Sequence, residues 1–167
     1  MRGIRMLCGM LCAVCLLCLP SCGEGERDVE EILLALREEA GELPAGEIYR
    51  WEAEEGSDGY LPPSLRDVLY GEEAAELFGL MEDYALYLSS FASPREIAVF
   101  RLRSRSDVER VAAVCLRRAD TLRVLLRGTE FWELTDSIRV VCKGRTVIMG
   151  LTDQPDEWET EALRLAG

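Results

Sequence analysis

The cysteines near the start of the chain are the residues whose spacing points most directly to chemistry. Four of them follow the pattern C-x2-C-x2-C-x3-C: Cys12, Cys15, Cys18 and Cys22. This spacing is typical of iron–sulfur ligands. The surroundings argue against a cluster, because residues 6–19 carry no charged side chain and no second cysteine group follows in the sequence. We therefore expect no iron–sulfur centre and assign no cofactor to the chain.

Neighbouring carboxylates offer a second kind of chemistry. Two carboxylates that flank a glycosidic bond can hydrolyse it, so a carboxylate-based hydrolase acting on cell-wall material is one function to consider. Such an enzyme needs one carboxyl group with a raised pKa in an apolar pocket. The acidic pairs of this chain lie instead in polar runs, where we expect them to be solvated: Glu30-Glu31, Glu38-Glu39, Glu54-Glu55, Glu72-Glu73 and Glu82-Asp83.

The 167 residues include no histidine. This excludes Ser-His-Asp and Cys-His nucleophile pairs and any site with histidine ligands. The acidic stretches 54–58 and 153–159 lack the D-x-D-x-D-G order of a calcium loop, and the chain contains neither G-x-S-x-G nor S-x-x-K. We therefore expect no metal site and no catalytic residue, and a protein that is not an enzyme.

The uncharged segment 6–19 follows a short basic start with Arg2 and Arg5. A positive start followed by an apolar stretch too short to span a bilayer is the layout of a secretory signal peptide. The next residues, Leu19-Pro20-Ser21-Cys22, resemble the bacterial lipobox, in which a small residue precedes the cysteine that becomes the lipid-modified N-terminus.

We expect residues 1–21 to be removed and Cys22 to carry a diacylglycerol anchor. Two or more acyl chains give stable attachment where one chain gives only marginal binding. The mature protein is then expected on the extracytoplasmic face of the cell membrane, with residues 22–27 as a lipidated tether. Cys115 and Cys142 remain. This location permits a disulfide between them, but each lies on an apolar stripe, and we favour two buried free thiols.

Charge is unevenly distributed along the mature chain. Removal of Arg2 and Arg5 takes the net charge from −12 to −14, which argues against nucleic-acid binding. Residues 22–94 hold four basic and 19 acidic side chains, whereas residues 95–145 hold 12 basic and seven acidic ones. The second stretch contains a candidate surface for a polyanionic wall polymer or an acidic partner, made of Arg101, Arg103, Arg105, Arg117, Arg118, Arg123, Arg127 and Trp132. The alternative, which we favour, is pairing between the basic and acidic halves.

The elements that position these residues follow from hydrophobic spacing. Asp28 and Glu31 form a capping box at the start of an amphipathic helix that ends before Gly41. Residues 42–64, rich in Gly, Pro and acids, indicate a surface loop. Two short helical turns are expected at 64–70 and 72–79, with these side chains facing inward: Leu65, Val68, Leu77 and Phe78.

The second half of the chain has the clearest pattern. Alternation over 84–89 and 96–102 predicts a hairpin. A capping box at 106–109 then begins a helix of about four turns, with an apolar stripe that includes Cys115 and Leu116. Alternating residues on both sides of the turn 143–145 predict a second hairpin, and Pro155 opens a terminal helix with Trp158, Ala162 and Leu165 on one face.

These elements predict a single α+β domain over residues 28–167. We expect a small antiparallel sheet of two hairpins packed against a central helix, with N- and C-terminal helices.

The leader with its lipobox, the run Pro94 to Phe100, the capped helix and the second hairpin resemble a family of small lipoproteins from Gram-positive bacteria. This is domain-of-unknown-function family 4358. The resemblance covers residues 28–156, differs most in the arginine-rich segment 121–135, and implies an extracytoplasmic α+β domain without implying any activity or cofactor. We expect a non-catalytic interaction module at the cell surface, anchored in the membrane through Cys22, that binds another cell-envelope protein or a wall polymer.

Overall fold

The computed structural model describes residues 26–90 and 93–167. The signal peptide and the lipidation site predicted from the sequence lie outside these residues. The strands are β1 (Gly46–Arg50), β2 (Met81–Ser89), β3 (Glu96–Leu102), β4 (Ile138–Lys143) and β5 (Thr146–Leu151). The helices are α1 (Val29–Glu39), α2 (Pro63–Tyr70), α3 (Ala74–Gly79), α4 (Val108–Leu125) and α5 (Pro155–Leu165), with 3-10 turns η1 (Arg105–Asp107) and η2 (Trp132–Ser137).

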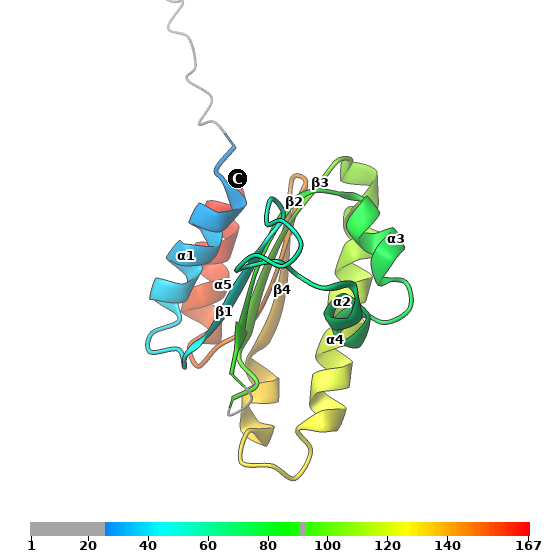
Figure 1. Cartoon of the computed structure of the whole chain (residues 1–167). Coiled ribbons are helices and arrows are strands. Elements are labelled where there is room, and N and C mark those ends of the chain that lie inside the picture. The colour runs from blue at the N-terminus through cyan, green and yellow to red at the C-terminus, as the bar shows by residue number, and fades with distance from the viewer. Residues whose placement is uncertain (1–25, 91–92) are drawn as a thin grey trace, which may run out of the picture.

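The strands form one antiparallel sheet in the order β1-β2-β3-β5-β4. The two predicted hairpins, β2–β3 and β4–β5, are joined where β3 pairs with β5, and β1 adds an edge next to β2. Helices α1 and α5 cover one face of this sheet, while α2, α3 and α4 cover the other (Figure 1). The α+β class and the arrangement of two hairpins around a central helix are therefore confirmed.

Successive strand residues point to opposite faces, so the sheet has a separate core on each side. Ala85 and Tyr87 of β2 face α1 and α5, and Trp158 of α5 is completely buried among them. Asp28 fixes the start of α1, since its carboxylate accepts from the backbone N–H groups of Glu30 at 2.8 Å and Glu31 at 3.3 Å. The cap predicted from the sequence is thus confirmed.

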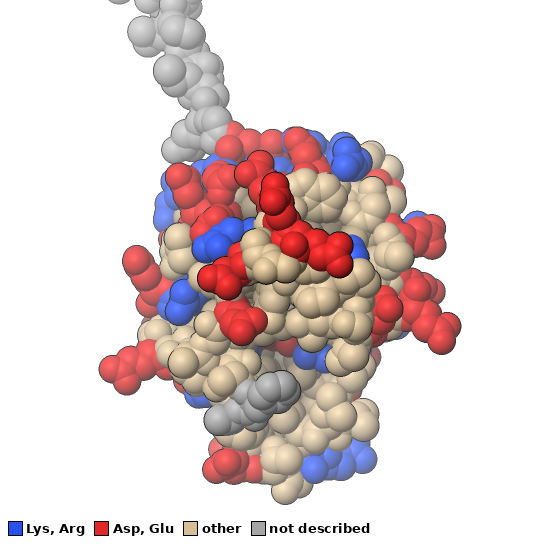
Figure 2. Space-filling model, viewed as in Figure 1, with Lys and Arg blue, Asp and Glu red and all other residues tan. Residues whose placement is uncertain are grey.

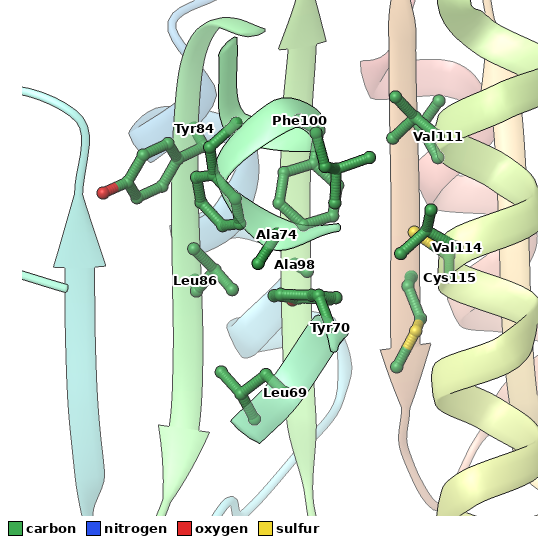
Figure 3. Close-up of a cluster of buried hydrophobic side chains, with 14 of the residues drawn as sticks. Leu69, Tyr70, Ala74, Tyr84, Leu86, Ala98, Phe100, Val111, Val114 and Cys115 are labelled. Carbon is green, nitrogen blue, oxygen red and sulfur yellow. The ribbon is translucent and has the colours of Figure 1, made fainter. Parts of the chain in front are cut away.

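The second core lies between the sheet and α2, α3 and α4 (Figure 3). Aromatic rings from four elements meet there: Phe78 packs edge-on against Tyr84 with centroids 5.0 Å apart, and Tyr70 against Phe100 at 5.8 Å. Cys115 of α4 is completely buried in this core as a free thiol, and burial raises its pKa. These contacts hold α2 and α4 on the same side of the sheet.

Four details of the sequence-based prediction are wrong. The stretch 42–64 is not all loop, because it contains β1. The helical segment that leads into α4 begins earlier than residue 106: Ser104 caps the turn η1 by accepting from the N–H of Ser106. Val68 is 74% exposed and Leu116 is 53% exposed, although both were expected to face inward.

Cys142 is the fourth exception. It is a free thiol as expected, but it lies exposed on the edge strand β4 and not in the core. In the part of the chain that the structure describes, no helix combines the length and the apolar character that a membrane crossing requires.

Candidate functional site

An apolar groove opens on the α2 side of the sheet, between α2, the end of β2 and the last turn of α4. Two adjoining hollows of about 490 and 350 Å³ form it, and they share Leu65, Leu88, Ser89 and Ser90. On the surface seen in Figure 2, an uncharged area extends over the centre and lower part, where β1 and α2 lie. The other lining residues are Ala45, Gly46, Glu47, Tyr49, Val68, Leu69, Ser93, Pro94, Arg95, Glu96, Arg118, Leu122, Leu126 and Phe131.

Local structure explains why apolar side chains collect here. Leu122 and Leu126 lie four residues apart and therefore on one face of α4, and both line the groove. Leu88 lies on the same sheet face as Leu86, which contributes to the core next to α2. Val68 of α2 forms part of the rim and is largely exposed. The groove is thus a continuation of the core that no described helix covers.

A buried ion pair lies within this groove. Glu96, the first residue of β3, accepts from Arg118 of α4: Nη2 lies 2.7 Å from Oε2, and Nε lies 3.2 and 3.3 Å from the two carboxylate oxygens. The Arg118 and Glu96 side chains are only 11% and 6% exposed. Nε and Nη2 of Arg118 are thus directed at the Glu96 carboxylate, so each charge has its counter-charge inside the protein.

Other polar groups of the groove also have partners inside the protein. The Ser89 hydroxyl donates to the carbonyl of Ser93. Arg95 donates from Nη1 to the Ser93 hydroxyl at 3.2 Å and its Nη2 pairs with Asp153 at 2.6 Å, while its Nε is buried without a hydrogen-bond partner among the described residues. A groove with apolar walls, whose buried charges neutralise each other, favours binding of apolar side chains over binding of ions.

Glu47 is the second carboxylate of the groove. In the β1–β2 and β2–β3 registers, Glu47 and Glu96 both lie opposite Leu88, so Leu88 separates them on the same sheet face. Strand spacing places their Cα atoms about 10 Å apart. The Tyr49 hydroxyl donates to Glu47 at 2.6 Å. Burial, together with this hydrogen bond, raises the pKa of Tyr49 to about 12.

The structure does not bring the seven predicted arginines together into one surface. Four have acidic partners: Arg101 with Glu26 at 3.5 Å, Arg117 with Glu73 at 2.9 Å, Arg118 with Glu96 and Arg123 with Asp120 at 2.8 Å. Arg101 and Arg117 therefore fit the expected pairing of the basic half with the acidic half, whereas Arg118 and Arg123 pair with acids of the basic half itself.

Arg103, Arg105 and Arg127 are exposed, and no ion pair joins them to another described residue. Arg103 and Arg105 lie before α4, whereas Arg127 and the 42% exposed Trp132 lie beyond its far end. The unpaired members of the predicted surface thus belong to opposite ends of the domain.

Within residues 26–90 and 93–167, no group of three or more potential metal-binding side chains is present. Comparison with known proteins finds no match for this chain among family models, curated proteins or solved structures.

Sequence reasoning did not find the groove. Its residues come from α2, from β1–β2 and from α4, which are up to 80 positions apart in the sequence and meet only through the sheet order. Val68 offered no signal, because Leu65, Val68 and Leu69 together have the spacing of an ordinary buried stripe.

Proposed function

We propose that this chain is a membrane-anchored, extracytoplasmic binding module without catalytic activity, whose groove takes up apolar side chains of another cell-envelope protein. The observation that carries the proposal is the groove itself: apolar walls around a buried ion pair whose charges neutralise each other. Catalysis needs a group with free hydrogen-bonding or nucleophilic capacity at the reacting atom. The buried carboxylate of Glu96 is already held by Nε and Nη2 of Arg118.

The rim supports a protein partner. Val68 is 74% exposed, and Leu125 is 64% exposed. Leu125 follows Leu122 by three residues, so helical spacing places it on the groove side of α4. Exposed apolar side chains that adjoin an apolar hollow are typical of protein interaction sites. A partner that inserts apolar side chains would cover the groove and the rim together.

The location rests on the leader, the lipobox and Cys22, which agree with one another as a secretion and acylation signal. The strongly acidic body offers no attraction to anionic lipid as a whole, so the acyl chains have to provide the attachment.

Substitutions in the rim test the binding site. Val68→Asp and Leu125→Asp place a charge in the apolar surface, so we expect at least tenfold less partner protein to co-purify from cross-linked membranes. Leu116→Asp is the matched control, because Leu116 lies on α4 with a similar exposure but nine residues before Leu125, which places it on the opposite side of the helix. Equal recovery with all three variants, or no reproducible partner of the unchanged protein, would contradict the proposal.

A second candidate is a carboxylate-based hydrolase acting on cell-wall material. It rests on Glu47 and Glu96, the two carboxylates that line the same groove. Turnover of purified cell-wall glycan that disappears in Glu47→Gln, with unchanged unfolding, would favour this function over the binding module. Absence of turnover by the unchanged protein removes it.

A further inference from the structure

The chain enters the domain at a fixed place. The Glu26 carboxylate lies 2.7 Å from Nη2 of Arg145 and 3.5 Å from Nε of Arg101. Arg145 also pairs with Glu82 and donates from Nη1 to the carbonyl of Leu102 at 3.1 Å. Residues from β2, β3 and the β4–β5 turn thus hold Glu26 at one end of the sheet. We call these four charged residues, Glu26, Arg101, Arg145 and Glu82, the entry clamp.

The entry clamp shortens the connection to Cys22. Without it, the domain would begin at Val29, the first buried residue of α1. The seven residues from Cys22 to Val29 span at most about 25 Å when extended, whereas the four from Cys22 to Glu26 span at most about 14 Å. Strand β2 is about 27 Å long at 3.4 Å per residue. The clamped connection is therefore only about half as long as the sheet. This restricts how far the domain can tilt relative to the membrane surface.

Two arginines at this end have no acidic partner among residues 26–90 and 93–167. Arg103 and Arg105 follow β3 in the connection to α4, both are exposed, and no ion pair joins them to another residue of the described ranges. The acids of the entry clamp are already paired with Arg101 and Arg145. Asp107, in the turn η1, is the acid nearest in sequence, so this connection keeps an excess of positive charge.

We propose that the end of the domain next to the entry clamp faces the membrane and that Arg103 and Arg105 bind the phosphate groups of phospholipid headgroups. The inference rests on the proposed function, because it requires the anchor at Cys22. A short tether brings the headgroup layer to this end, and an exposed guanidinium pairs with phosphate oxygens in a bidentate geometry. Of the anionic groups in a cell envelope, lipid phosphate is the one that the tether places here.

The proposal also sets the direction of the groove. Ser89 and Phe131 lie at the opposite end of the sheet, where β2 and α4 end (Figure 1). The groove would then open about 27 Å farther from the membrane than the arginines, facing proteins of the envelope and not the acyl chains.

Arginine modification in vesicles tests the proposal. The mature protein, purified from membranes, is placed in vesicles of phosphatidylglycerol and phosphatidylcholine and, separately, in vesicles of a phosphate-free diacyl glycolipid. Phenylglyoxal modification is then followed by mass spectrometry. We expect Arg103 and Arg105 to react at least fivefold more slowly in phospholipid than in glycolipid vesicles. Arg127, which is exposed and unpaired at the far end, serves as the control and should react equally in both.

Three outcomes of this experiment would contradict the inference. Equal reaction of Arg103, Arg105 and Arg127 in attached protein overturns the orientation. Slow reaction of Arg103 and Arg105 in both kinds of vesicle overturns the phosphate contact. Protein that does not attach to either vesicle contradicts the anchor, and with it the proposed function and this inference together.

A substitution in the entry clamp tests whether the clamp orients the domain on the membrane or whether the anchor alone brings the arginines close to it. Glu26→Gln weakens the pairing to Arg101 and Arg145 and frees up to three further residues of tether, so we expect the protection of Arg103 and Arg105 to fall at least twofold. Glu42→Gln changes an exposed carboxylate in the connection between α1 and β1 and should leave the protection as it was. Equal protection in both variants would show that the clamp does not orient the domain.

Discussion

Glu96 and Arg118 show how strongly a single residue can depend on its partner. Both side chains are almost fully buried, so removing them from water has a large cost that their mutual attraction offsets only while both are present. The neighbouring pair of Arg117 and Glu73 has a similar distance but is more than half exposed on both sides. Solvent screens that pair, and its contribution to stability is small.

Glu96→Gln should therefore lower the free energy of unfolding by about 3 kcal/mol, because it leaves the Arg118 guanidinium buried without a counter-charge. Urea unfolding followed by circular dichroism measures this loss. Glu73→Gln is the matched control, with an expected loss below about 0.5 kcal/mol. Similar losses in the two variants would mean that the Glu96 pair is as well solvated as the Glu73 pair.

Asp83 differs from Glu96, because its surroundings disfavour the charged form of the carboxylate. Burial raises its pKa, as do the carboxylates of Asp28 and Glu52, while the Tyr84 backbone N–H and Arg101 act against the increase. A pKa that is higher in the folded than in the unfolded protein means that ionisation above the folded pKa destabilises the fold.

Asp83→Asn should consequently stabilise the protein at pH 7, by less than about 1 kcal/mol because the side chain is partly solvated. The gain should shrink as the pH falls through the folded pKa. It should vanish below the ordinary aspartate value near 3.8, where Asp83 is protonated in both states. Thermal unfolding measures the gain in stability at pH 7 and its disappearance at pH 3, and the exposed Asp67→Asn serves as control. A gain that persists at pH 3 would contradict the electrostatic explanation.

At the scale of elements, α5 lies very close to β5 in the core between the sheet and helices α1 and α5. A Cβ atom on Gly150 would lie 2.3 Å from the Trp158 indole ring, so only glycine lets the helix approach the strand this closely. Trp158 is completely buried, and its rigid ring has no room to move aside.

Gly150→Ala should destabilise the domain by about 2–3 kcal/mol through overpacking, as measured by chemical unfolding. The smaller ring of Trp158→Phe should restore part of this loss in the double variant. Gly79→Ala is the control, since a Cβ there meets no atom within 4 Å. If Gly150→Ala unfolds like the control, the packing of α5 on β5 is looser than described.

The elements that the sequence predicted correctly are those whose signals are local. Helix α1 has its cap at Asp28, α5 has Pro155 at its start, and the strands of both hairpins are largely apolar runs separated by turn residues. Strand β1 has no such signal: Gly46–Arg50 is short, half-exposed and surrounded by acids, glycines and prolines. Its conformation depends on β2, where Gly46 lies so close to Leu88 that any Cβ would collide with the backbone.

The groove and its ion pair could not be predicted from local sequence signals either. Glu96 lies in a strand-like run, and Arg118 was predicted as part of a basic interaction surface, so neither residue pointed to the other. Only the packing of α4 against the sheet removes both from water and turns them into partners. The pairing of basic with acidic segments, in contrast, was foreseeable from the opposite charges of the two halves.

The molecule as a whole is acidic: the sequence has a net charge of −12, and the mature form that we propose, without Arg2 and Arg5, has −14. Such a body is repelled by anionic lipid, and in the proposed orientation the positive charges of Arg103 and Arg105 oppose this repulsion locally. Attachment should therefore depend on the acyl chains at Cys22 and little on ionic strength.

A wash with 1 M salt should leave the protein in the membrane fraction, because two or more acyl chains hold it independently of charge. Mass spectrometry of the N-terminal peptide should show a chain that begins at Cys22 and carries the mass of a diacylglycerol. Release by salt, or an unmodified peptide after Ser21, would contradict the anchor.

Helices α1 and α5 pack against each other on one sheet face although they are the first and last helices of the domain. Half of the interior therefore stays open until the final residues are available. If the chain crosses a membrane with its N-terminus leading, α1 arrives on the far side well before its partner. Acylation of Cys22 would then modify a chain that has not finished folding. The lipid anchor would keep this incompletely folded chain beside the bilayer until α5 packs against α1.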